Sequence, residues 1–81
     1  MSVTVRLSRV GSTHDPRYRI VVQPTKSKRD GKAIDVLGYF HPLREAKDQI
    51  SIDLKKLDTW VSQGAIVSRT VSSIAKKARN N

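Results

Sequence analysis

Four basic side chains crowd into seven residues of the stretch QPTKSKRDGK, which covers residues 23–32. They are Lys26, Lys28, Arg29 and Lys32. The pair Asp30-Gly31 is typical of a turn between two strands, which explains these two residues but not the cations around them. Each lysine or arginine that neutralises a phosphate releases counterions and so favours binding to nucleic acid. The stretch is therefore a candidate phosphate contact, and a merely solvated loop is the alternative.

Side chains suited to catalysis or metal binding are sparse. His14 and Asp15 are neighbours ahead of a proline, but adjacent residues in a turn rarely orient one another. The chain has no cysteine, and it lacks both a G-x-S-x-G elbow and a P-loop. His41 is too isolated to predict a metal site with His14, and the aspartates lack the close spacing of a metal-dependent nuclease. We expect no enzyme activity, no metal and no cofactor, with such a nuclease kept as an alternative.

The charge of the chain indicates a polyanionic partner. Sixteen Lys and Arg stand against seven Asp and Glu, which gives a net charge of +9 and a pI near 10.5. Residues 1–32 hold eight of the basic and only two of the acidic side chains. No basic amphipathic helix with bulky apolar anchors is evident, so nucleic acid is favoured over a membrane. We expect a soluble cytosolic protein without a membrane span, a secretory signal or a small-molecule substrate.

Alternating apolar residues predict the strands that must carry these cations. Residues 3–10 place Val3, Val5 and Leu7 on one face, and residues 17–22 place Tyr18, Ile20 and Val22 inward. If the two strands pair, Arg6 and Arg19 share an exposed surface, and Asp35 of the next strand is expected to neutralise part of that pair. In that strand, residues 33–40, we expect Ile34, Val36 and Phe40 on one face and Asp35, Leu37 and Tyr39 on the other.

Backbone-shaping residues and a change of period complete the expected fold. Gly38 predicts a bulge or a close backbone approach, Pro42 ends the third strand, and residues 50–52 add a short one. Asp53 is expected to cap a helix over residues 54–63 that Gly64 terminates, and Ser68 to cap a second helix. The order predicts a single α+β domain over residues 1–81. Its small sheet has about four or five short strands, with two C-terminal helices packed on one face or end.

RNA suits this scaffold better than DNA. No basic recognition helix is evident, and loops and strand edges fit the shape and backbone recognition of folded RNA. Tyr18 and Phe40 are expected to face inward, which leaves Tyr39 as the candidate for base stacking. We therefore expect recognition of backbone and shape, with little base readout.

Three stretches resemble one known family. VTVRLSRVGS at residues 3–12, YRIVVQPTKSKRDGKAIDVLGYFHP at 18–42 and DLKKLDTWVSQGAIVS at 53–68 are similar to the sixteenth protein of the bacterial small ribosomal subunit. The resemblance implies a structural constituent that binds and stabilises the folded 5′ and central regions of small-subunit ribosomal RNA during assembly. It also implies other small-subunit proteins as partners and a ribosomal location, cytoplasmic or organellar. A free-standing basic RNA-binding or chaperone protein remains the alternative.

The same resemblance implies which residues contact RNA. They are Arg6, Arg9, Ser12, His14, Arg17, Lys26, Lys28, Arg29 and Lys32, and the exposed strand face adds Arg19. Gly31, Gly38 and Pro42 match positions that shape the backbone.

Overall fold

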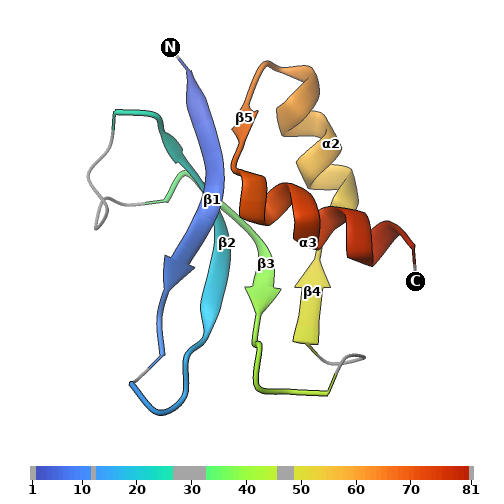
Figure 1. Ribbon diagram of the computed structural model, residues 1–81. Coiled ribbons are helices and arrows are strands. Elements are labelled where there is room, and N and C mark those ends of the chain that lie inside the picture. Colours follow the sequence, from blue (N-terminus) through green and yellow to red (C-terminus); the bar gives the residue numbers. More distant parts are fainter. Residues whose placement is uncertain (1, 12, 27–32, 46–48, 81) are drawn as a thin grey trace.

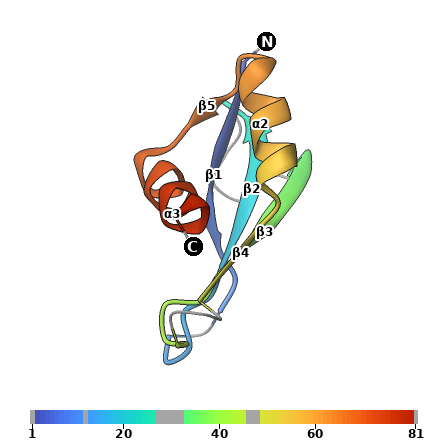
Figure 2. The same ribbon diagram turned by 90° about the vertical axis from the view of Figure 1, so that its right-hand side faces the viewer.

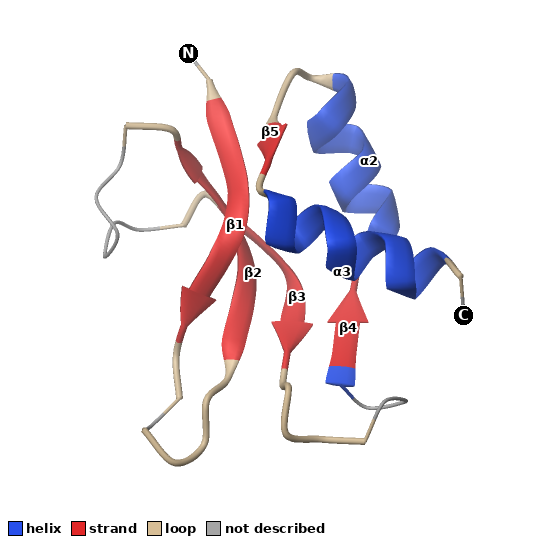
Figure 3. Cartoon of the chain, viewed as in Figure 1, coloured by secondary structure: helices blue, strands red, loops and turns tan. Residues whose placement is uncertain are grey.

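The computed structural model describes residues 2–11, 13–26, 33–45 and 49–80. Within these ranges most strands precede the helices, as Figures 1 and 3 show. The elements are β1 (Val3–Arg9), β2 (Tyr18–Pro24), β3 (Asp35–Phe40), β4 (Ile50–Ile52), α2 (Leu54–Ser62), β5 (Ile66–Val67) and α3 (Arg69–Arg79). The prediction of an α+β fold with its helices at the C-terminal end is confirmed.

The described strands form a five-stranded sheet in the order β4-β3-β2-β1-β5. Neighbouring strands are antiparallel except β1 and β5, which run parallel. The sequence patterns did not predict β5, whose two residues pair with Thr4 and Val5. The pairing is extended by the Ser68 amide, which donates to the Val5 carbonyl at 3.0 Å. The last strand of the chain, β5, is therefore an edge strand of the sheet and lies next to β1.

The predicted alternation holds in the two long strands. Val5 lies opposite Val22, and Leu7 lies opposite Ile20. Val5, Ile20 and Val22 are fully buried and belong to one apolar core. The pairing also places Arg6 and Arg19 together on the opposite face, as expected, because Arg6 and Arg19 alternate with these buried residues.

A bulge in β3 changes the predicted pattern of that strand. Ile20 pairs with Gly38 while its neighbour Val21 pairs with Val36, so β3 carries one extra residue at Leu37. Leu37 is 3% exposed and lies in the core, and Phe40 also packs against the core. The expectation that Phe40 shares a face with Val36 is therefore wrong, because the extra residue reverses the alternation between them.

Gly38 makes the close approach that its position predicted. A Cβ atom there would overlap the Ser51 carbonyl oxygen and lie 2.7 Å from the Ile52 Cα atom of β4. Any side chain at this position would therefore push β4 away from β3. The bulge and the close approach occur together, so both readings of Gly38 are confirmed.

Asp35 faces the helices, and its expected role beside Arg6 and Arg19 is wrong. Trp60 Nε1 of α2 donates to Asp35 Oδ2 at 3.2 Å, and Lys56 Nζ lies 3.5 Å from Oδ1. Asp35 pairs with Val22, and directly opposite residues of neighbouring strands share one face of the sheet. Because the Val22 side chain is in the core, the Asp35 carboxylate is on the helix side. The Trp60 hydrogen bond holds the pKa of this carboxyl below its ordinary value; burial opposes the shift, and Val36 N–H and Lys56 support it.

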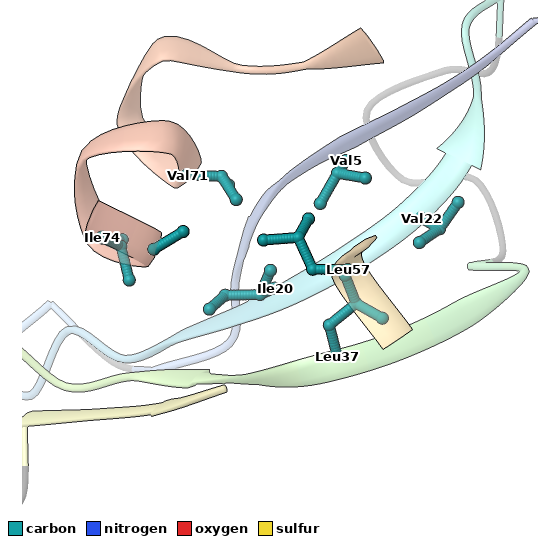
Figure 4. Packing of buried hydrophobic residues seen from close by; sticks show 8 residues of the cluster. Val5, Ile20, Val22, Leu37, Leu57, Val71 and Ile74 are labelled. Carbon is teal, nitrogen blue, oxygen red and sulfur yellow. The ribbon is translucent and has the colours of Figure 1, made fainter. Parts of the chain in front are cut away.

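Both described helices pack on the same face of the sheet. Leu57 of α2 and Val71, Ile74 and Ala75 of α3 join the strand residues in one cluster (Figure 4). The predicted caps are present, since the Asp53 carboxylate accepts from Lys56 N–H and the Ser68 hydroxyl accepts from Val71 N–H. Gly64, with φ of 95°, follows the end of α2 as predicted. The opposite face of the sheet carries no described helix.

Candidate nucleic-acid interface

The sheet face that carries no described helix holds two of the candidate cations, Arg6 and Arg19. We call it the open face, and the strand registers define its members. They are Thr4, Arg6 and Ser8 of β1, Arg19, Val21 and Gln23 of β2, Val36 and Tyr39 of β3, and Ser51 of β4. The face combines guanidinium and hydroxyl groups with one exposed aromatic ring, which are groups suited to RNA backbone and bases.

Arg6 is held in place at the middle of the open face. Its Nε atom donates to Gln23 Oε1 at 2.6 Å, and Gln23 is only 2% exposed. Beside them Val21 is fully buried. The Arg6 side chain is therefore anchored by its neighbour on β2, which reduces the conformational entropy lost when it contacts a phosphate.

Arg19 lies further along the same face and is exposed. It sits directly opposite Ser8 on one side and Tyr39 on the other. Its side chain makes no hydrogen bond or ion pair with any other residue that the structure describes. Tyr39 is 57% exposed, whereas Tyr18 and Phe40 stack on each other with ring centroids 6.0 Å apart. Among these three rings, Tyr39 is the one that offers an open surface to a base.

A polar cluster of Asp15, Arg17, His41 and Arg44 lies at one end of the sheet. The β1–β2 and β3–β4 connections lie side by side there in both views (Figures 1 and 2). His41 Nε2 lies 2.8 Å from Asp15 Oδ1, and Arg44 Nε donates to His41 Nδ1 at 2.7 Å. Because Nδ1 accepts, the proton is on Nε2, and the ring donates to the Asp15 carboxylate. Asp15 also pairs with Arg17 at 3.4 Å.

The electrostatics of this cluster favour an ionised Asp15. The hydrogen bond from His41 lowers the pKa of the Asp15 carboxyl, burial opposes that shift, and Arg17 and Arg44 lower it further. Both partners of the Arg17–Asp15 pair are about half exposed, at 54% and 48% of their side-chain surface. Exposed pairs of this kind contribute little to stability, so Arg17 can exchange Asp15 for a phosphate at small cost.

The described RNA-contact candidates divide between the two ends of the sheet. Arg17 and the exposed His14 lie at the end where the two connections meet, near Arg19. Lys26 is exposed beyond the far end of β2, seven residues from Arg19, or roughly 23 Å of extended chain. Arg9 follows Arg6 by three positions in β1 and pairs with Tyr18, so it lies on the face of the sheet that carries the helices. The structure thus does not bring Arg9 to the open face.

Five of the predicted positions lie outside the described residues. They are Ser12, Lys28, Arg29, Gly31 and Lys32. Pro42 is described and follows the end of β3, and its carbonyl accepts a hydrogen bond from Gln49 Nε2 at 2.9 Å.

The partnership between Asp15 and His41 was not predicted. Asp15 was considered only beside His14, its neighbour in sequence, whereas the contact joins residues 26 positions apart. The one shared sequence signal is that Asp15 and His41 each precede a proline, which is too common to predict a contact.

The described residues contain neither a metal-binding cluster nor a membrane-spanning helix. Across residues 2–11, 13–26, 33–45 and 49–80, no three His, Asp or Glu side chains gather closely enough to hold a metal ion. The helices in the same ranges are too short and too polar to span a membrane.

The fold and its surface define a small cationic α+β protein with helices on one face of the sheet and arginines on the other. Residues 9–68 match the family model for ribosomal protein S16. The small ribosomal subunit protein bS16 of Borrelia duttonii (strain Ly) is 49% identical over 78 residues, which cover 96% of this chain and 93% of that relative. The bS16 protein of Borreliella burgdorferi (strain ZS7) is 46% identical over 81 residues, covering 100% and 93%. The chain therefore belongs to the ribosomal protein S16 family.

Proposed function

We propose that the chain is a structural constituent of the small ribosomal subunit. In this role it binds folded small-subunit ribosomal RNA, in the 5′ and central regions, and stabilises that fold during assembly. Its partners are this RNA and other small-subunit ribosomal proteins, and it works on the ribosome in the cytoplasm. The chain is not an enzyme, because its family consists of structural ribosomal components.

The observation that carries the proposal is the near full-length similarity to relatives named as small-subunit ribosomal proteins. The charge supports it independently. A net charge of +9 on 81 residues destabilises a compact domain by self-repulsion, and a polyanion relieves that repulsion. Arg6 and Arg19 on the open face then supply backbone contacts without a recognition helix.

The proposed interface has a strand part and a loop part, and residues 1–81 act as one RNA-binding domain. The strand part consists of Arg6 and Arg19 on the open face and of His14 and Arg17 in the adjoining β1–β2 connection, and the family resemblance adds Arg9 and Ser12. The loop part consists of Lys26 together with Lys28, Arg29 and Lys32. The length of β2 separates Lys26 from Arg17 and Arg19, so together these cations suit an extended RNA surface better than a single phosphate.

Binding measured against two RNAs tests this function. The full chain is titrated into a fragment spanning the 5′ and central regions of small-subunit ribosomal RNA, and into an unrelated folded RNA of equal length, at several salt concentrations. We expect a strong preference for the ribosomal fragment that persists at moderate salt. Equal and steeply salt-dependent binding to both RNAs would contradict the proposal and favour a free-standing basic RNA-binding protein.

A further inference from the structure

A hollow of about 290 Å³ opens at the end of the sheet where the β1–β2 and β3–β4 connections meet. Its lining includes Arg17, Arg19, Tyr39, His41, Arg44 and Ser51. Arg19, Tyr39 and Ser51 are members of the open face, whereas Tyr18 and Phe40, which also line the hollow, belong to the other face. The hollow therefore lies at the end of the sheet and borders the open face. The volume lies near the lower limit of the range of small-ligand pockets, which is roughly 300–1,000 Å³.

The polar lining of the hollow suits an anion. Three arginines and no carboxylate are among the described residues that line it, and the neighbouring Asp15 carboxylate is already held by His41 and Arg17. Arg44 uses Nε to hold His41, and its two Nη groups make no hydrogen bond to any part of the chain that is described. Asp15 fixes His41 from the other side, and the His41 side chain is only 17% exposed. The Arg44 guanidinium is thus positioned by a chain of side chains, with a free edge for a bidentate phosphate contact.

The aromatic lining suits a base. Tyr39 is directly opposite Arg19 on β2 and Ser51 on β4. Its ring is more than half exposed, and the bulge at Leu37 sets it on the open face. An exposed tyrosine beside arginines is a stacking surface that accepts any base. A hollow for phosphate alone would need neither this ring nor this volume.

We propose that the hollow holds one unpaired nucleotide of the bound RNA. Its base stacks on Tyr39, and its phosphate is bound by Arg44 and Arg17, with Arg17 released from Asp15. This inference rests on the proposed function, which makes RNA the partner. It gives Tyr39, until now only a candidate for base stacking, a defined site, and it adds Arg44 to an interface otherwise expected to recognise mainly backbone and shape.

Titration of the full chain with uridine 5′-monophosphate, followed by amide NMR shifts, tests the hollow directly. We expect concentration-dependent shifts at Tyr39, His41 and Arg44. The Tyr39→Leu variant should weaken nucleotide binding about tenfold, because base stacking is lost. Tyr39→Phe should bind like the wild type, which separates stacking from any loss of folding. Arg69→Gln removes one positive charge at the exposed start of α3, as Arg44→Gln does in the hollow. It is the matched control for Arg44→Gln and should leave nucleotide binding unchanged.

Two further probes identify the ligand chemistry. Inorganic phosphate should shift the amides near the arginines more weakly than the nucleotide and should be unaffected by Tyr39→Leu. Arg44→Gln should weaken the binding of both anions. The proposal is overturned if the nucleotide leaves the hollow unshifted, if inorganic phosphate or a tetraglutamate peptide binds there as well as the nucleotide does, or if Tyr39→Leu is silent. None of these results depends on which large RNA the chain prefers, so they are distinct from a failure of the proposed function.

Discussion

Gly38→Ala tests whether β4 approaches β3 as closely as the fold requires. The new Cβ atom would overlap the Ser51 carbonyl and lie 2.7 Å from Ile52 Cα, where ordinary contact begins at 3.4 Å. Ile52 would have to retreat by about 0.7 Å, and the Ser51 carbonyl by more. Both obstacles are backbone atoms, so no side chain can rotate to relieve them. The strand that must move also carries Ile50 and Ile52, which pack against the core.

We expect Gly38→Ala to lower the free energy of unfolding by about 3 kcal/mol, the upper end of overpacking costs. In a domain of this size each kcal/mol lowers Tm by roughly 4–8 °C, so the shift should be unmistakable in a thermal or urea unfolding curve. Gly64→Ala is the control. It meets no atom within 4 Å and costs only its φ of 95°, about 1 kcal/mol. If Gly38→Ala were the milder of the two, the close approach of the strands would be refuted.

Three further predictions concern the loop, the Trp60 contact and acid stability. Neutralising Lys28 and Arg29 together should weaken binding to ribosomal RNA and lower its salt slope by roughly 0.7–0.9 per lost contact; an unchanged slope would remove the loop from the interface. Trp60→Ala should cost about 3 kcal/mol of stability and Trp60→Phe clearly less, about 1–2, since the phenyl ring keeps most of the packing while the hydrogen bond to Asp35 is lost; two equal values by urea unfolding would contradict the packing. Because the folded pKa of Asp35 is lowered, its contribution is complete above the ordinary value of about 3.9 and is lost as pH falls through the folded pKa. The stability gap between wild type and Asp35→Asn should therefore close in acid, and a gap independent of pH would contradict this assignment.

Local signals predicted the elements of this fold well. Asp53 and Ser68 cap the helices through bonds that depend on residues three positions away, so the sequence contains all the information needed. β5 was missed because the two residues Ile66 and Val67 are too few to show a period, and they become a strand only when β1 lies beside them.

The candidate site was predicted less completely because its key contacts are tertiary. Arg6 and Arg19 were placed correctly from strand alternation, which needs only the pairing of two neighbouring strands. Asp35 was predicted to lie on the face of Arg6 and Arg19, which is wrong. No sequence pattern predicts its hydrogen bond to Trp60, which is 25 positions away. The joining of Asp15 to His41 likewise depends on two connections meeting at one end of the sheet.

The parallel pairing of β1 with β5 also affects how the chain can fold as it is synthesised. The outer edge of β1 finds its partner only after residues 66–68 have been made, and Val71 and Ile74 must follow before the core is covered. Until then the N-terminal strands expose an unpaired edge and apolar side chains, a state prone to aggregation. Contacts this distant in sequence also slow folding. The nascent chain therefore lacks a finished core until residues 71–75 have been made, whereas the cationic residues 1–32 are made earlier and can already bind RNA.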